Sequence, residues 1–213
     1  PRIISDNSKF PSKEHVAKMV LVHDKEYNVK GLISDYETWI LAIMSKISLN
    51  IFEFGTCSGK TTYLMALNSP SDSKITTITL KPNQKNYIKK QNLDNGISYR
   101  NILNESIYEK FLFSGSEEEK KIQVLFLDST KLEISNHVDS YDLIFIDGGH
   151  TYSIVKNDSE KSFKMIKKNG YIFWHDYVPG KESAKDIVKY IHEISKHKEI
   201  LHIKNTSLCF FRK

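Results

Sequence analysis

Carboxylate and imidazole side chains recur directly after short apolar segments of this 213-residue chain. Five such positions stand at 53–59, 80–81, 128–129, 147–150 and 175–176, and all but 80–81 contain an acid. Carboxylates accept hydrogen bonds and bind cations, and histidine exchanges protons near neutral pH. A sheet that served structure alone would need none of these groups at its strand ends. We therefore expect these positions to converge on a functional site.

The apolar segments themselves predict the sheet that positions these groups. They are short and almost continuously hydrophobic, which is typical of parallel strands buried on both faces. We expect strands at 51–54, 75–80, 124–127, 143–146 and 171–174. Two last strands, 200–204 and 207–211, are joined only by Asn205 and Thr206, a link too short for a helical crossover, so they should be antiparallel. The predicted fold class is a doubly wound α/β sheet, in which ligands bind beyond the carboxyl ends of the strands.

Helical patterns separate these strands and also precede them. The interleaved helices are expected at 61–67, 82–93, 153–168 and 182–196. The third should end at Asn169–Gly170, because both residue types adopt the left-handed conformation that terminates helices. We predict two parts in the chain, an N-terminal helical cap over residues 1–50 and one domain over residues 51–213.

Two helices are expected inside the N-terminal cap. The first is indicated by Val16, Val20 and Tyr27, which lie near helical spacing. The second begins at a capping box, Ser34-Asp35-Tyr36-Glu37. Its apolar stripe is expected to consist of Tyr36, Ile40, Ile43 and Ile47.

Composition and charge narrow the functional classes. The net charge is only +5, three of the basic residues are Arg, and the lysines are scattered, so we expect no nucleic-acid partner. No apolar run is long enough to span a bilayer, so we expect no membrane partner. Two cysteines cannot build a disulfide framework, which favours a cytoplasmic location. A removed leader stays open because the chain starts at Pro1, and a homo-oligomer stays open as well.

A glycine-containing loop follows the first strand and opens a helix. It reads E-F-G-T-C-S-G-K-T-T from Glu53 to Thr62. One interpretation is the phosphate loop of a kinase or NTPase, with Lys60 on the phosphates and Asp147 on magnesium. That motif needs four residues between its glycines, whereas three separate Gly55 from Gly59 here. The shorter loop would lack amide donors that the phosphates require.

The other interpretation rests on the whole pattern from residue 53 to residue 176. The loop resembles the E-x-G-x-x-x-G signature of class I S-adenosylmethionine-dependent methyltransferases. Residues 143–152 read L-I-F-I-D-G-G-H-T-Y, and Val155, Asp158, Asn169–Gly170 and Trp174–Tyr177 follow. This order resembles the I-D-G-x-H-x-Y…D…G-G…H-D-Y pattern of small O-methyltransferases, the macrolide-sugar enzymes among them. The resemblance implies a Rossmann-like, seven-stranded, mostly parallel sheet that ends in an antiparallel hairpin.

The resemblance also implies roles for individual residues. The methionine portion of S-adenosylmethionine would lie on Glu53, Gly55, Thr56, Ser58 and Gly59. Asp128 and Ser129 would hold the adenine, Leu80 would stand beside the ribose, and Asp147 would also contact the cofactor. Asp147 and Asp176 would bind a divalent cation such as Mg²⁺, with His175 either a further ligand or a buried histidine satisfied by a backbone carbonyl. His150 would act with Asp147 in catalysis, as the base that deprotonates a hydroxyl of a small molecule or sugar.

This chain departs from the family pattern at the second strand. That strand normally ends in an acid that grips both ribose hydroxyls, whereas Thr79-Leu80-Lys81 contains none. A cofactor-binding domain without turnover therefore stays open as an alternative, beside the kinase or NTPase. Among the other candidates, we expect Trp174 to lie in the core, Cys57 to be a small filler, and Asp158 to face solvent or to orient a neighbour. Residues 94–121 and the N-terminal helices should cover the acceptor.

Overall fold

Seven strands form one sheet in the computed structural model, which describes residues 33–84 and 89–213. The strand order is β3-β2-β1-β4-β5-β7-β6, in which β7 pairs antiparallel with both β5 and β6 and all other neighbours pair parallel. The strands are β1 (Asn50–Phe54), β2 (Lys74–Thr79), β3 (Ile122–Phe126), β4 (Tyr141–Ile146), β5 (Ile166–Trp174), β6 (Leu201–His202) and β7 (Cys209–Arg212). The predicted doubly wound, mostly parallel sheet with its antiparallel C-terminal pair is confirmed.

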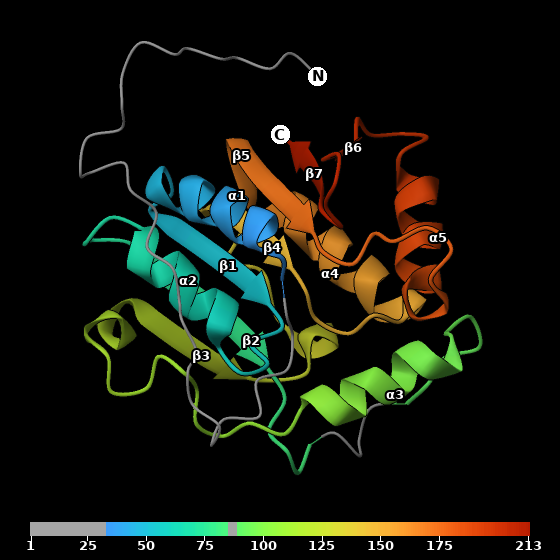
Figure 1. Ribbon diagram of the computed structural model, residues 1–213, viewed down its shortest axis with the longest axis horizontal. Coiled ribbons are helices and arrows are strands. Elements are labelled where there is room, and N and C mark those ends of the chain that lie inside the picture. The colour runs from blue at the N-terminus through green and yellow to red at the C-terminus, as the bar shows by residue number, and fades with distance from the viewer. Residues whose placement is uncertain (1–32, 85–88) are drawn as a thin grey trace.

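Helices cover both faces of this sheet (Figure 1). One face carries α1 (Asp35–Lys46) and α2 (Lys60–Asn68), and the other carries α4 (Tyr152–Met165) and α5 (Lys185–Ile194). Short 3-10 turns stand at η3 (Glu117–Lys121), η4 (Ser129–Lys131) and η5 (Glu182–Ala184). The remaining helix, α3 (Gly96–Glu105), lies beyond the carboxyl ends of the strands instead of on a face.

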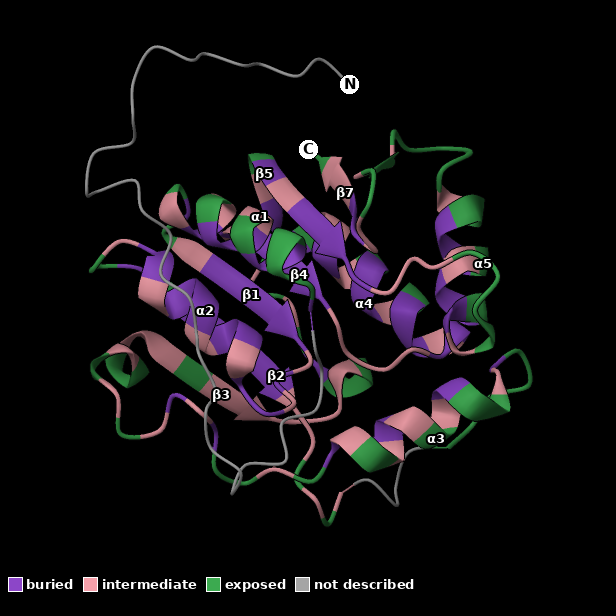
Figure 2. Cartoon of the chain, viewed as in Figure 1, coloured by how far each residue is buried: buried purple, intermediate pink, exposed green. Residues whose placement is uncertain are grey.

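The alternation of side chains along each strand builds two cores, one on each face. Phe52, Ile144 and Trp174 point toward α4 and α5, whereas Ile51, Phe145 and Phe173 lie in the cluster of α1 and α2. All six are at most 3% exposed, so both faces are dry, as the continuous hydrophobicity predicts. Figure 2 shows the buried central strands between helices that expose only their outer sides.

The helix α1 forms where the capping box predicts it, but it turns a different face inward. Ser34 Oγ accepts a hydrogen bond from the backbone of Glu37, whose carboxylate accepts from the backbone of Ser34. Leu41 and Ala42 are buried against α2, whereas Tyr36, Ile43 and Ile47 are exposed. The predicted stripe is therefore wrong, because the small and polar side chains beside Leu41 allow closer packing. The earlier helix around Val16 to Tyr27 lies outside the described residues.

Two other boundaries differ from the sequence-based expectation. The described residues between 82 and 93 form turns, and the helix begins only at Gly96, where the Asn95 side chain accepts from the amides of Ile97 and Ser98. The helix α4 ends at Met165, and Asn169–Gly170 lie inside β5 instead of terminating the helix. Asn169 has φ of +67° beside a register shift between β4 and β5. Left-handed Asn169 therefore marks an irregularity in strand pairing and not the end of a helix. The left-handed conformation that favours Asn or Gly occurs both at helix caps and at irregular points in strands.

Candidate cofactor and metal site

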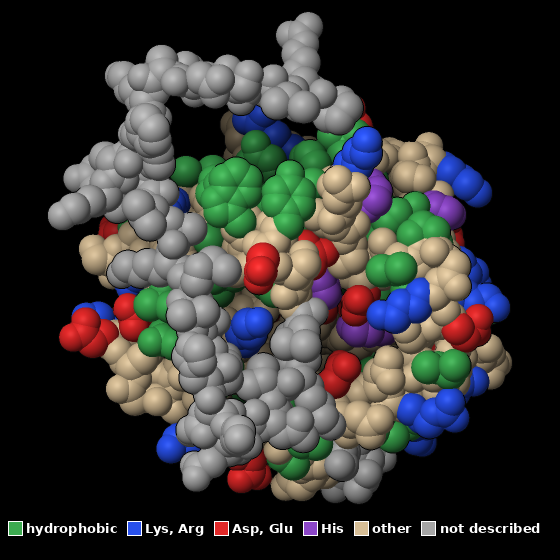
Figure 3. Space-filling view, viewed as in Figure 1, with side chains coloured by type: hydrophobic (Ala, Val, Ile, Leu, Met, Phe, Trp, Pro, Cys, Tyr) green, Lys and Arg blue, Asp and Glu red, His purple; other side chains and the backbone are tan. Residues whose placement is uncertain are grey.

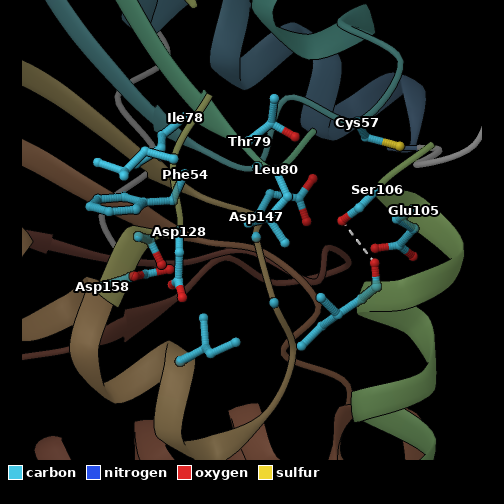
Figure 4. Close-up of a pocket in the computed structure, with 17 residues that line it drawn as sticks. Phe54, Cys57, Ile78, Thr79, Leu80, Glu105, Ser106, Asp128, Asp147 and Asp158 are labelled. Carbon is cyan, nitrogen blue, oxygen red and sulfur yellow. Dashed lines mark hydrogen bonds between the residues drawn. The ribbon is translucent and has the colours of Figure 1, made fainter. Parts of the chain in front are cut away.

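A pocket opens at the carboxyl ends of β1 to β4, where the fold predicts a ligand. Five of the residues predicted to bind the cofactor line it, namely Gly55, Leu80, Asp128, Ser129 and Asp147. Figure 4 shows Asp128 and Asp158 at one end of this pocket and Cys57, Glu105 and Ser106 at the other. Acidic side chains line both of these ends, and apolar residues such as Ile78 and Leu127 also line the pocket.

The loop that follows β1 packs directly against the backbone at the end of β4. Gly55 has φ of +101°, and a Cβ atom there would lie 2.2 Å from the carbonyl oxygen of Asp147. Gly59 has φ of +79° and begins α2, packed against the rings of Phe111 and Phe113. Only glycine fits Gly55, because any side chain would clash with backbone. This tight turn leaves the rim of the pocket open.

Glu53 lies behind this loop and is fully buried. Its Oε2 accepts hydrogen bonds from the hydroxyls of Thr62 and Thr77, the latter at 2.6 Å. Its Oε1 has no hydrogen-bond partner among the described residues. Burial raises the pKa of Glu53 to about 8, although the two threonine hydroxyls act in the opposite direction. A buried oxygen without a partner is unfavourable unless a ligand supplies a donor.

The ends of β4 and β5 bring together a candidate cation site. One ligand atom each of Asp147, His175 and Asp176 lies within 4.8 Å of the others. Nε2 of His150 lies 3.4 Å from Oδ2 of Asp176 and 3.8 Å from Oδ1 of Asp147. Asp176 has φ of +59°, a conformation unusual for a residue other than glycine and frequent at functional sites. The four predicted catalytic and metal residues therefore converge at one point.

The charges of this cluster are strongly coupled. Burial alone would raise the pKa of Asp147, but His175 and His150 outweigh burial and hold that pKa well below its ordinary value. Burial would lower the pKa of His175, but Asp147 and Glu37 outweigh burial and raise it to about 11. Asp147 and Asp176 likewise raise the pKa of His150 against its burial. Without a cation, protonated His175 therefore balances the negative charge of Asp147.

Glu37 of α1 is a functional neighbour that the sequence analysis missed. Its Oε2 lies 3.6 Å from Nε2 of His175, on the opposite side of the ring from Asp147. Its Oε1 accepts hydrogen bonds from the backbone and hydroxyl of Ser207, at 2.6 and 2.7 Å. The same carboxylate thus caps α1, tethers the C-terminal strand pair and orients His175. Nothing local in the sequence signals this, because the capping box alone accounts for the residue type.

Asp158 corrects an expectation, because it does not face solvent. It is 1% exposed, and its Oδ1 accepts a hydrogen bond from Asn157 at 2.8 Å. Burial raises its pKa to about 7. It lines the same end of the pocket as Asp128 (Figure 4). The position of Asp158 in the motif could be recognised from the sequence, but the direction of its side chain depends on how α4 packs.

Other predicted residues lie around the pocket instead of on its wall. Thr56 and Ser58 are buried, and the hydroxyl of Thr56 lies 2.7 Å from that of Thr77. Trp174 is in the core, as expected, and donates from Nε1 to Ser159 at 2.8 Å. Burial raises the pKa of Cys57 to about 12, which agrees with a filler and not with a nucleophile.

A second, open groove lies on the other side of the cation cluster. His175, Asp176, Tyr177, His202 and Asn205 are among the residues that line it. Figure 3 shows histidine and acidic side chains side by side near the middle of this face of the molecule. The cluster therefore lies between the pocket, which Asp147 lines, and the open groove, which His175 and Asp176 line.

Comparison with known proteins agrees with this geometry. Residues 52–177 match the model of a family described as methyltransferase domain. No protein with curated annotation matches the chain in sequence. Because the family model covers more than half of the 213 residues, the chain belongs to this methyltransferase-domain family. The resemblance drawn from the motifs is confirmed at this level.

Several solved structures with the same fold are described as O-methyltransferases. An O-methyltransferase from Bacillus cereus in complex with S-adenosylhomocysteine is 18% identical, with a TM-score of 0.53, and the match covers 85% of this chain and 82% of that one. An O-methyltransferase of tomaymycin synthesis from Streptomyces achromogenes, in complex with S-adenosylmethionine, is 11% identical, with a TM-score of 0.54 and coverages of 85% and 80%. A third, from Thermotoga maritima, is 11% identical, with a TM-score of 0.56 and coverages of 88% and 68%. The kinase or NTPase interpretation of the loop is not favoured.

Within the part of the chain that the structure describes, no helix is both long and apolar enough to cross a membrane.

Proposed function

We propose that this chain is an S-adenosylmethionine-dependent O-methyltransferase that acts on a hydroxyl of a small molecule or sugar, assisted by a divalent cation. One observation carries the proposal. Asp147 lines the pocket at the carboxyl ends of β1 to β4 and also belongs to the Asp147–His175–Asp176 cluster, so the two sites meet at a single residue. A methyl donor in the pocket and a hydroxyl at the cluster would therefore be adjacent, as an in-line displacement requires.

The residues of the pocket fit the cofactor. Oε1 of buried Glu53 has no hydrogen-bond partner among the described residues, so it suits the ammonium of the methionine portion of the cofactor. Gly55 carries no side chain, which leaves room for the amino-acid end of that portion. Asp128 suits the adenine amine, because one of its oxygens already accepts from Thr130 and the other remains for a ligand. When bound, S-adenosylmethionine supplies a methyl group that its sulfonium already activates.

The cluster fits a hard divalent cation such as Mg²⁺, since it offers two carboxylates and one imidazole nitrogen. When bound, such a cation lowers the pKa of a coordinated hydroxyl. His150 lies within 4 Å of both carboxylates and is the residue placed to take the hydroxyl proton. Glu37 keeps Nδ1 of His175 turned toward Asp147.

The acceptor would enter through the open groove next to the cluster. The groove combines the aromatic ring of Tyr177 with the polar side chains of Asn205 and His202. An aromatic face with polar groups around it suits a hydroxylated ring, which has an apolar face and polar edges. The groove is open enough to admit acceptors of several sizes.

Calorimetry followed by a transfer assay tests the proposal. We expect S-adenosylhomocysteine to bind and ATP not to bind, and Asp128→Asn to weaken S-adenosylhomocysteine binding, while the exposed Asp72→Asn leaves it unchanged. Incubation with S-adenosylmethionine and a panel of hydroxylated small molecules should release S-adenosylhomocysteine, and chelation or His150→Ala should suppress that release. Binding of ATP without S-adenosylhomocysteine would contradict the proposal. Cofactor binding without turnover on any acceptor would leave the cofactor-binding domain as the function.

A further inference from the structure

The carboxyl end of β2 presents no acid to the pocket. Thr79 and Leu80 line the pocket there, and Lys81 follows. In sheets of this type, a carboxylate at that point ordinarily accepts from the ribose of a bound nucleotide. A ribose in this pocket would lose two charge-assisted hydrogen bonds unless another element supplied them.

A carboxylate of another element occupies the opposite wall. Glu105 is the last residue of α3 and lines the same pocket as Leu80 and Cys57. Figure 4 shows its side chain beside Ser106, across the pocket from Leu80. Besides the effect of burial, its negative charge acts to raise the pKa of both Cys57 in the glycine loop and His150.

The helix that carries Glu105 is held firmly at its other end. The amide of Asn95 donates to Asp186 at 2.7 Å, and the Asn95 side chain donates to Glu182 at 2.8 Å. The hydroxyl of Ser98 donates to the carbonyl of Ser183 at 3.1 Å. These bonds fix α3 against η5 and the start of α5, so Glu105 stands on a rigid support and not on a free loop.

The position of Glu105 departs from a local rule for helix sequences. A negative side chain in the last turn of a helix opposes the helix dipole. Asp147 and Asp176 lie at the same end of the sheet and add like charge near it. A side chain that breaks a local rule at the wall of a pocket is typical of a functional site.

Resting on the proposed function, we propose that Glu105 accepts hydrogen bonds from the vicinal ribose hydroxyls of the cofactor and replaces the acid that β2 lacks. Its two oxygens match a pair of neighbouring hydroxyls. In the proposed function, Oε1 of Glu53 already accepts a hydrogen bond from the ammonium of the methionine portion. The ribose is therefore the part of the cofactor that remains without an anionic partner.

Two ligands distinguish a contact with the ribose from a contact with the amino-acid end of the cofactor. S-adenosylhomocysteine has both parts, whereas 5′-methylthioadenosine has the ribose and lacks the amino acid. We expect Glu105→Gln to weaken both by the same factor, about tenfold or more, measured by calorimetry. The 2′- and 3′-deoxy derivatives of 5′-methylthioadenosine should bind the unmodified chain more weakly and should lose most of the effect of Glu105→Gln. Glu109→Gln, an exposed change of the same charge four residues on, should leave all affinities unchanged.

The outcomes separate this inference from the proposed function. Unchanged S-adenosylhomocysteine affinity in a folded Glu105→Gln chain would overturn the ribose role while the proposed function stands. A loss confined to S-adenosylhomocysteine would also overturn it, because Glu105 would then contact the amino-acid end. If the unmodified chain bound neither ligand, the proposed function itself would fail and this inference with it. Circular dichroism checks that the Glu105→Gln chain is folded.

Discussion

Nδ1 of His175 lies 3.0 Å from Oδ1 of Asp147. The two residues follow Ile146 and Trp174, which are register partners in neighbouring parallel strands, so sheet pairing alone brings them side by side. Glu37 contacts the other ring nitrogen from α1. A carboxylate, an imidazole and a second carboxylate therefore form a line from the helix layer to the cofactor pocket. This arrangement fixes the ring orientation in the way that outer partners orient metal-binding histidines.

The first prediction concerns the cation. Asp176→Asn should weaken Mn²⁺ binding at least tenfold, because it removes an anionic ligand. It should leave S-adenosylhomocysteine affinity nearly unchanged, because Asp176 does not line the cofactor pocket. Paramagnetic resonance of free Mn²⁺ measures the first and calorimetry the second. Asp72→Asn is the control, and equal Mn²⁺ affinity in both variants would exclude Asp176 as a ligand.

The second prediction concerns the pH dependence of cofactor binding. The pKa of Glu53 is raised to about 8 by burial, so the free protein holds this carboxyl largely protonated at pH 7. An ammonium at Oε1 requires the ionised form, and binding should therefore release a proton. S-adenosylhomocysteine affinity should rise between about pH 6 and 8, and Glu53→Gln should bind weakly at every pH. Calorimetry in buffers of different ionisation enthalpy counts the protons, and a count of zero at pH 7 would contradict the assignment.

The same shift makes a third prediction about stability. The unfolded chain loses the Glu53 proton near the ordinary pKa of 4.5, whereas the folded chain keeps it to about 8. The contribution of Glu53 to stability is therefore full below about pH 4.5 and is lost as pH rises through 8. Glu53→Gln should thus be increasingly more stable than the ligand-free unmodified chain over this range, as urea unfolding would measure. A constant difference at all pH values would show that Glu53 ionises normally.

The fourth prediction separates backbone strain from steric clash. Gly55 and Gly115 both have positive φ, but a Cβ at Gly115 would meet nothing within 4 Å, whereas at Gly55 it would clash with Asp147 backbone. Gly115→Ala should cost about 1–2 kcal/mol, the usual cost of a left-handed residue. Gly55→Ala should cost clearly more and should also abolish S-adenosylhomocysteine binding. Urea unfolding and calorimetry measure both variants, and equal destabilisation would mean that the loop is free to move.

The fifth prediction concerns Glu37. Glu37→Gln removes the charge that faces His175 and the charged acceptor of the hydrogen bonds from Ser207, and it should destabilise the chain by about 1.5–3 kcal/mol. Ser207→Ala removes one tether of Glu37 and keeps the contact with His175, so it should leave the histidine unaffected. Nuclear magnetic resonance of the imidazole should show a lower His175 pKa in Glu37→Gln alone. An unchanged pKa would mean that Asp147 orients the ring without Glu37.

Local patterns in the sequence predicted the strands and one edge of the site. Continuous apolar runs such as 143–146 identify strands because burial on both faces leaves no polar position. The acids after those runs then had to meet, since the carboxyl ends of parallel strands lie at the same edge. Asp147 and Asp176 are adjacent for this reason alone. The glycine loop was recognisable because its spacing and its place after a strand are both local features.

The sequence by itself therefore determined the sheet, the loop and the convergence of Asp147, His150, His175 and Asp176. The tertiary structure decided which face α1 buries, where α3 lies, and that Glu37, Asp158 and Glu105 belong to the site. Those three carboxylates stand on helices, and a helix can present any of its sides to a neighbour. Glu37 contacts His175 and Ser207, which are more than 130 residues away along the chain. Contacts of that separation depend on how complete elements pack, and no local pattern of residue types encodes them.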